Sequence, residues 1–185
     1  MIRWALWIVA GILLGGIVHL VTVLILPRTA TQDAYARFAA FAPSNAVAAV
    51  PHAAPQSMAL PFMDPAFAVA VCRYDLGESP LKLRVPVQTA YTSVSFYTRR
   101  GVSYYAINDR AAGRRVIELE LMTAEQQSQL PDDEEVTAAD RLIVVSPTVT
   151  GLILIRALAA EPSQMAQARN ALAAARCERA PLQPQ

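Results

Sequence analysis

The sequence predicts a mainly β domain, an antiparallel sheet or sandwich with a few short helices, preceded by one N-terminal transmembrane helix. Two observations lead to this fold class. A long apolar run without charged side chains lies near the N-terminus, and later stretches alternate apolar and polar residues with the period of two that strands show. The chain divides into a transmembrane signal anchor (1–28), a membrane-proximal helix and Pro/Ala-rich connection (29–65), a β domain with a C-terminal helix (66–180) and a polar tail (181–185).

The composition fits a membrane protein and argues against nucleic-acid binding. Apolar residues make up 54% of the chain, which exceeds the usual share of a soluble domain, about half or less. The 16 basic and 15 acidic side chains nearly cancel, so no net field draws the protein to a polyanion. We therefore expect the lipid bilayer, and no nucleic acid, among its partners.

Residues 4–26 predict the membrane-spanning helix. These 23 uncharged residues form about 35 Å of helix, enough to cross a hydrocarbon core of roughly 30 Å. A secretory signal peptide has a shorter apolar region and a small-x-small cleavage site, whereas this run ends in Pro-Arg-Thr-Ala at 27–30. We interpret it as an uncleaved, single-pass anchor of the inner membrane. The short basic start favours an inside N-terminus and a periplasmic domain, although the flanking arginines alone leave the orientation open.

One face of this helix is a candidate contact with another membrane helix. Gly11, Gly15 and His19 recur every four residues and therefore stack on one side. Small residues at this spacing let a second helix approach closely, and a neutral imidazole can donate a hydrogen bond across the contact. The alternative is that glycine is simply common in membrane helices and that His19 bonds locally.

After the anchor, the sequence predicts a short helix and then an irregular connection. Residues 33–41 have amphipathic spacing, with Tyr35, Phe38 and Ala39 on one side, and we expect them near the membrane surface. The five prolines within 42–65 prevent a long helix or a central strand. This segment is therefore interpreted as a packed but irregular connection.

Alternation with a period of two predicts strands, each buried on one side, at 81–85, 90–97 and 117–121. Turn residues between the apolar runs predict hairpins at 77–80, 99–101 and 111–113. Residues 142–159 are apolar, but Pro147 and several polar residues interrupt them, so we expect two buried strands joined by a turn.

Two further helices are predicted from their start signals. Thr123 and Gln126 form a capping box that opens a short helix, which must stop before Pro131. A final helix is expected to begin near Pro162, which suits a first-turn position, and to run to about Arg176.

The two cysteines are candidates for a disulfide. Cys72 lies in a predicted core strand and Cys177 just beyond the last helix, so a bond would tie that helix to the sheet and would suit an oxidising compartment. The alternative is two unrelated buried thiols. Because the chain has no Cys-x-x-Cys and only two histidines, we expect no zinc site and no other cofactor.

No catalytic signature is present, since Gly-x-Ser-x-Gly, His-Glu-x-x-His, P-loop and Gly-x-Gly-x-x-Gly patterns are all missing. Polar residues at two strand ends form one candidate ligand site, with Arg73 and Tyr74 at the first and Asp109 and Arg110 at the second. Paired Arg and Asp at neighbouring ends bind a carboxylate or sugar, or merely neutralise each other.

A second candidate contact is the face of the 90–97 strand that carries Tyr91 and Tyr97. Aromatic and hydroxyl groups alternate on it, which suits a ligand groove or a protein contact, and equally an ordinary solvent-exposed face.

Four short motifs resemble a known family. They are Asp-Pro-Ala-Phe at 64–67, Val-Cys-Arg-Tyr-Asp-Leu at 71–76, Thr-Ser-Val-Ser-Phe-Tyr at 92–97 and Tyr-Ala-Ile-Asn-Asp-Arg at 105–110. As a set they resemble the domain of unknown function (DUF) 1254 family over most of residues 30–180. The layout of a short anchor plus a β domain is similar to the small alphaproteobacterial branch of that family.

This resemblance implies a companion protein but no established activity. Larger relatives fuse the domain to a second one of the DUF 1214 family, and the small anchored proteins tend to be encoded beside a separate small protein of that second type. We therefore expect a non-enzymatic cell-envelope protein that serves as a binding or assembly module, pairing with such a companion or with itself. The alternative is a small-ligand-binding or hydrolytic periplasmic domain that uses the polar strand ends.

Overall fold

A computed structural model describes residues 1–29, 33–51, 63–87, 90–112, 115–129 and 142–180. The chain separates into two compact units, Met1–Asp33 and Ala34–Gln185. Three predicted features lie outside the described residues: the polar tail, the stop before Pro131, and the middle of the Pro-rich connection at 52–62.

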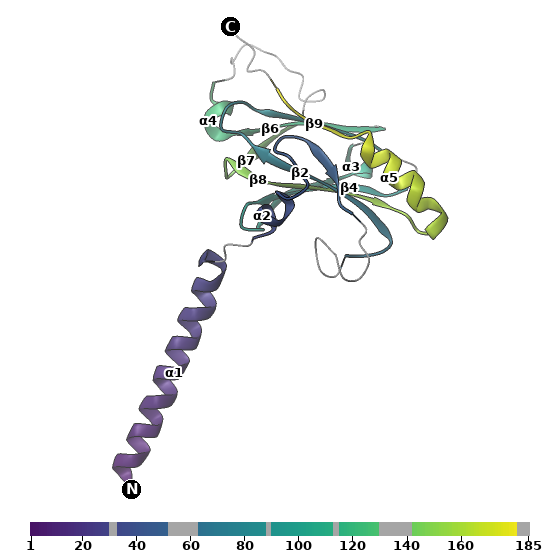
Figure 1. Ribbon diagram of the computed structural model, residues 1–185. Helices are drawn as coiled ribbons and strands as arrows, with labels where there is room; N and C mark the ends of the chain where they lie inside the picture. Colours follow the sequence, from purple (N-terminus) through teal and green to yellow (C-terminus); the bar gives the residue numbers. More distant parts are fainter. Residues whose placement is uncertain (30–32, 52–62, 88–89, 113–114, 130–141, 181–185) are drawn as a thin grey trace. The chain divides into compact units, whose positions relative to one another are not determined.

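The first unit is a single helix, α1 (Ile2–Thr29), shown in purple in Figure 1. Its 25-residue segment Ile2–Leu26 is long and apolar enough to cross a membrane, and as an N-terminal helix it is compatible with an anchor or a signal sequence. The hydroxyl of Thr22 donates to the carbonyl of Val18 at 2.8 Å, so this polar group is satisfied inside the helix.

The second unit is built on two sheets, which confirms the predicted mainly β fold class (Figure 1). In spatial order, the described strands of the first sheet are β1 (Val47–Ala49), β2 (Phe67–Asp75), β8 (Thr150–Leu158), β4 (Thr92–Thr98) and β5 (Ser103–Asn108). Those of the second sheet are β7 (Leu142–Ser146), β6 (Val116–Thr123), β3 (Leu81–Pro86) and β9 (Arg176–Arg179). All described neighbours pair antiparallel except β6 and β7, which are parallel.

Of the three predicted hairpins, the one at 99–101 is confirmed, and it joins β4 to β5. Gly101 lies in its turn with a φ of 83°, a backbone conformation that favours glycine. The hairpins predicted at 77–80 and 111–113 are wrong, because in both cases the chain leaves the first sheet and enters the second. Gly113 itself lies outside the described residues, and a short helix, α3 (Asp109–Ala112), precedes it. Turn residues mark a change of direction, but a crossing between sheets uses the same residue types as a hairpin.

The main core lies between the two sheets. In β3 the predicted alternation is confirmed, since Leu81, Leu83 and Val85 are buried while Lys82 and Arg84 are exposed. Tyr74 of β2 and Phe96 of β4 are among the largest fully buried side chains of the same core.

One part of this core is filled by a helix packed on small side chains. After the 3-10 turn η1 (Pro162–Gln164), helix α5 (Met165–Ala173) buries Ala168 and Leu172 in the same cluster as Ala68 and Ala157 of the first sheet. The predicted final helix is therefore confirmed in place but ends three residues earlier than expected, because the chain turns into β9 at Arg176.

A second apolar cluster lies on the other face of the first sheet. Helix α2 (Ala34–Phe38) packs Tyr35 and Phe38 with Val71 of β2 and Leu152 of β8. The predicted pairing of Tyr35 and Phe38 on one buried side is confirmed, whereas Ala39 is exposed. The membrane-proximal helix is thus part of the packing of the β domain.

The prediction that β4 is buried on one side only is wrong. Ser93 and Ser95 are only 7% and 5% exposed, while Val94 and Phe96 are buried on the opposite face.

Strand β1 was not predicted, since it is a three-residue edge strand in an Ala-rich, Pro-flanked segment. The capping box is confirmed: at the start of α4 (Ala124–Gln127), Thr123 and Gln126 exchange hydrogen bonds of 3.2 and 2.9 Å.

A candidate binding cleft between two strand edges

Cys72 and Cys177 are joined by a disulfide in the structure, with their Cα atoms 6.5 Å apart and a sequence separation of 105. Cys72 lies in β2 of the first sheet and Cys177 in β9 of the second, so the bond holds the two sheets together beside the edge of each. Closing a loop of this length stabilises a fold by up to about 4.7 kcal/mol on the chain-entropy model.

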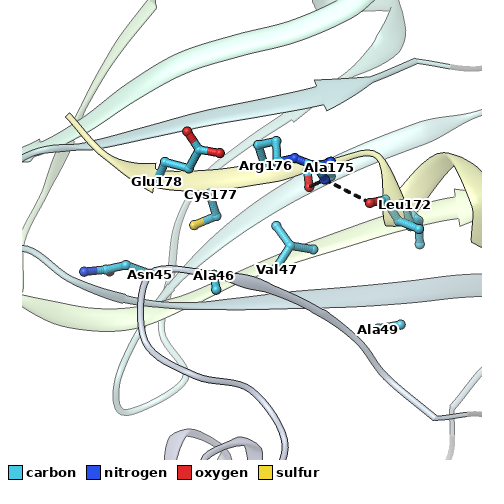
Figure 2. Close-up of a pocket in the computed structure, with 10 residues that line it drawn as sticks. Asn45, Ala46, Val47, Ala49, Leu172, Ala175, Arg176, Cys177 and Glu178 are labelled. Atoms are coloured by element: carbon cyan, nitrogen blue, oxygen red, sulfur yellow. Dashed lines mark hydrogen bonds between the residues drawn. The ribbon is translucent and has the colours of Figure 1, made fainter.

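An open cleft of about 460 Å³ lies next to Cys177, between β1, β9 and the C-terminal end of α5 (Figure 2). Val47, Leu172 and Ala175 supply apolar wall, and Asn45, Arg176 and Glu178 supply polar side chains. The volume lies in the range of roughly 300–1,000 Å³ found for ligand pockets. The site is thus formed where the sandwich is left open between the edges of its two sheets.

Two of the polar side chains in this cleft are already used by the fold. Arg176 donates through Nη1 to the carbonyls of Ala173 and Ala175, both at 3.0 Å, and so caps the end of α5. The amide of Asn45 donates to the Asp75 carbonyl at 3.0 Å and accepts from the Asp75 N–H at 2.8 Å, which extends the sheet beyond β1. These bonds hold the walls of the cleft in place.

Backbone groups supply further donors and acceptors at this site. The N–H of Ala180 donates to the Pro80 carbonyl at 2.8 Å. Because bonded and non-bonded pairs alternate along an antiparallel ladder, Cys177 and Arg179 point their N–H and C=O groups away from β3. On β1, the N–H of Val50 donates to the Val69 carbonyl at 2.9 Å. By the same alternation, Val47 and Ala49 point their N–H and C=O groups away from β2.

Among the described strands, none pairs with the outer edge of β1 or of β9. Val47, Ala49 and Cys177 all line the cleft, so unpaired strand backbone is present on both of its walls. Sequence reasoning missed this site because β1 and β9 are short and lie far apart in sequence.

Tyr74 lies in a different part of the core, in a cluster of hydroxyl groups. Its phenol oxygen is 3.0 Å from Ser146 Oγ and 3.3 Å from Thr148 Oγ1, and it accepts from the hydroxyl of Tyr104 at 3.2 Å. Tyr104 reaches the cluster because a bulge in the β4–β5 ladder leaves it unpaired. Burial raises the pKa of Tyr104 well above its ordinary value.

Gly151 makes room for this cluster. A Cβ atom at that position would lie 2.3 Å from the Tyr74 hydroxyl oxygen and 2.3 Å from the Tyr97 carbonyl oxygen, so any side chain there displaces the cluster or the backbone. With its hydrogen bonds made inside the core, Tyr74 supports the fold rather than an exposed ligand site.

The structure does not bring the two predicted strand ends together. Asp75 pairs with Thr150 of β8, whereas Asn108 pairs with Ser93, which in turn pairs with Arg156 of β8. Six residues of extended strand separate these levels, a distance of roughly 20 Å. The Arg73, Tyr74, Asp109 and Arg110 side chains therefore do not converge on one ligand.

The charged residues of this predicted strand-end site either have local partners or are exposed. Arg73 donates to the Ala42 carbonyl at 3.0 Å and lies over the ring of Tyr35, 4.3 Å from its centroid. Asp109 accepts from the N–H of Thr92 at 3.4 Å, and Arg110 is exposed on α3.

The predicted Tyr91–Tyr97 face is not one continuous exposed surface. Tyr91 is 39% exposed and meets the ring of Phe67 edge-on. Tyr97 is half-buried against the second apolar cluster.

In the α1 helix, Gly11 and Gly15 have open space where a Cβ would stand. No group of three or more His, Cys, Asp or Glu able to hold a metal occurs within the described part of the chain.

The family comparison agrees with the motifs. Residues 44–179 match the family model described as "Protein of unknown function (DUF1254)", which covers more than half of the chain and confirms the predicted family. No curated protein matches the chain.

A solved structure shares this fold at low identity. The crystal structure of the VPA0106 protein from Vibrio parahaemolyticus is 14% identical, with a TM-score of 0.57, over 79% of this chain and 34% of that protein. An uncharacterised protein from Burkholderia cenocepacia is also 14% identical, with a TM-score of 0.47, over 73% of this chain and 34% of that one. This chain thus spans about a third of the length of the solved proteins it matches.

Proposed function

The chain belongs to the DUF1254 family, whose function is unknown, and on that premise we propose that it is a single-pass inner-membrane protein of the cell envelope. Its periplasmic β domain is a binding or assembly module for a companion membrane protein. The observation that carries the proposal is the cleft whose opposite walls hold two strand edges, neither of which pairs with another described strand. The assignment to the small alphaproteobacterial branch of the family is part of the same proposal.

The anchor and the disulfide support the location. An apolar helix of 25 residues precedes the domain, and disulfides such as Cys72–Cys177 persist mainly in oxidising compartments, of which the bacterial periplasm is one. The N-terminus then lies in the cytoplasm and the β domain on the opposite side.

The groups in the cleft favour a polypeptide over a small polar ligand. The side chains of Arg176 and Asn45 are held by hydrogen bonds to backbone groups elsewhere in the fold. Apart from the Glu178 carboxylate, the backbone of β1 and β9 therefore supplies the available donors and acceptors. An extended peptide matches such groups by adding a strand to the edge, and apolar walls such as Val47 and Leu172 accommodate its alternate side chains. We propose that a segment of the companion pairs with β9 in this way.

A companion is also supported by the size of the solved relatives, because the matched domain makes up only 34% of each of them. We propose that in this protein the partner is a separate chain, a small membrane protein of the DUF 1214 type or a second copy. The Gly11, Gly15 and His19 face of α1 supplies a second contact inside the membrane.

The proposal is tested by purifying the tagged full-length protein from native membranes in mild detergent and identifying stoichiometric partners by mass spectrometry. Arg179→Pro removes an outward N–H of β9 and leaves its bonds to β3 intact, so partner recovery falls by about tenfold, the effect of losing one hydrogen bond. Arg179→Ala is the matched control, since both variants lose the exposed ion pair with Glu78 and only the proline loses the donor.

Gly15→Leu tests the membrane contact separately, because it fills the open space on the helix face and leaves the sequence of the β domain unchanged. A protein that purifies as a monomer from native membranes contradicts the assembly proposal. In that case a small ligand in the cleft becomes the better function, and screening on the same purified protein is the next step.

A further inference from the structure

Three exposed arginines lie on α2 and on the hairpin between β4 and β5. Arg37 lies in the last turn of α2, and Arg99 and Arg100 form the turn of the hairpin. Asp33, half-buried, is the acidic residue that precedes α2 in sequence. We name Arg37, Arg99, Arg100 and Val102 the arginine hairpin surface.

Ring contacts join α2 to the hairpin. The guanidinium of Arg73 lies 4.3 Å from the centroid of the Tyr35 ring, and that of Arg99 lies 5.3 Å from it. Phe38, in the same helix, is 2% exposed in the apolar cluster below. The Tyr35 ring therefore holds Arg99 of the hairpin against α2, the helix that carries Arg37.

An apolar side chain accompanies these cations. Val102 follows the arginines at the tip of the hairpin and is 62% exposed, more than any other large hydrophobic residue among the described residues of the β domain. A small apolar tip beside arginines matches the boundary between phospholipid headgroups and acyl chains, where cations bind phosphate and apolar groups enter the lipid.

Arg37 of this surface is also close to the apolar helix in sequence, since α2 begins at Ala34 and α1 ends at Thr29. Clusters of basic residues next to a membrane span bind anionic lipids. We infer that the arginine hairpin surface binds the anionic phospholipid headgroups of the bilayer in which α1 is anchored. This inference rests on the anchoring part of the proposed function and is independent of the cleft and of any companion.

The test places a fluorescent probe at the hairpin tip of the full-length protein. Val102→Trp is made with Trp4→Phe and Trp7→Phe, so that the introduced indole is the only one, and the protein is incorporated into nanodiscs containing brominated phospholipid. We expect strong quenching with brominated phosphatidylglycerol, little with brominated phosphatidylcholine, and loss of quenching at about 1 M salt, where the Debye length falls to about 3 Å.

Matched controls separate this surface from the rest of the domain. Tyr91→Trp, in the same background, places the indole at the opposite end of β4, roughly 20 Å away along the strand, and stays unquenched. Arg100→Glu and Arg37→Glu reduce quenching of the hairpin probe, whereas Arg110→Glu, an exposed arginine on α3, leaves it unchanged.

The outcomes distinguish this inference from the proposed function. A protein that enters nanodiscs but shows no quenching, or equal quenching in both lipids, overturns the lipid contact and leaves the anchor standing. A protein that stays soluble without detergent and does not enter nanodiscs contradicts the anchor and, with it, this inference.

Discussion

The two sides of the sandwich differ in how their polar groups are satisfied. On the side of β5 and β7, the hydroxyls of Tyr104 and Ser146 meet Tyr74 and close the core with internal hydrogen bonds. On the side of β1 and β9, a disulfide holds the sheets together but the strand edges stay unpaired among the described residues. We propose that the closed side serves stability and the open side serves binding, a division that variants on each side can test.

Removing the disulfide has the largest expected effect. Cys72→Ala with Cys177→Ala lowers the free energy of unfolding by about 2–5 kcal/mol, because the unfolded chain regains the freedom of a long loop. Urea denaturation measures it, and wild-type protein reduced with dithiothreitol should match the variant. Partner recovery falls as well, since β9 is no longer tied to β2. A variant as stable as the wild type would show that the bond contributes nothing.

Gly151→Ala is expected to destabilise the closed side of the sandwich by a steric clash. Its methyl group would lie 2.3 Å from the Tyr74 hydroxyl and from the Tyr97 carbonyl, so we expect a loss of about 3 kcal/mol from overpacking. Gly77→Ala is the control, because its Cβ meets only side-chain atoms at wider distances, Asp75 Oδ1 at 3.2 Å and Val149 Cγ1 at 3.8 Å. Below its melting temperature the Gly151 variant should retain the partner, which separates the two sides. Loss of the partner from fully folded protein would contradict the division.

Tyr74→Phe is a milder test of the same side. It removes the oxygen that accepts from Tyr104 and contacts Ser146, at an expected cost of about 1–2 kcal/mol for groups left without a partner. Thermal unfolding of the purified protein measures the change. Tyr91→Phe serves as the comparison, because the Tyr91 hydroxyl has no hydrogen-bond partner within the described residues. Equal effects of the two variants would argue against the network.

The smallest effect concerns pH. Burial raises the pKa of the Tyr104 phenol in the folded state, so the folded protein holds this proton more tightly than the unfolded chain does. The stabilisation is complete below the unfolded pKa of about 10 and is lost as pH rises above it. Unfolding measured from pH 8 to 11 should therefore show a decline that Tyr104→Phe reduces. An identical decline in the variant would assign it to other groups.

Much of the local structure follows from the sequence. The uncharged run predicted the long apolar helix, the alternation of Leu81, Leu83 and Val85 predicted β3, and Thr123 with Gln126 predicted the start of α4. Each signal depends on residues within a few positions of one another. The motifs at 64–110 likewise identified the family.

The candidate cleft and the separation of the two strand ends could not be predicted from the sequence. Tyr74 and Asp109 were both correctly placed near strand ends, but strand ends carry no information about register, and the pairing through β8 puts them at opposite ends of the sheet. The cleft combines β1 with β9, two short segments without a strong pattern of their own. The disulfide pair was the one long-range feature that could be named in advance, because the chain contains only two cysteines.

The sequence by itself determined the apolar helix, most of the strand positions, the tight turn at Gly101 and the family, because hydrophobic period, turn chemistry and motifs are properties of neighbouring residues. Only the tertiary structure decided which sheet each strand joins, that α2 covers the first sheet, and that two strand edges face one cleft. The physical reason is that strand pairing and packing are selected by contacts such as Phe67 opposite Leu158, between residues far apart in the chain.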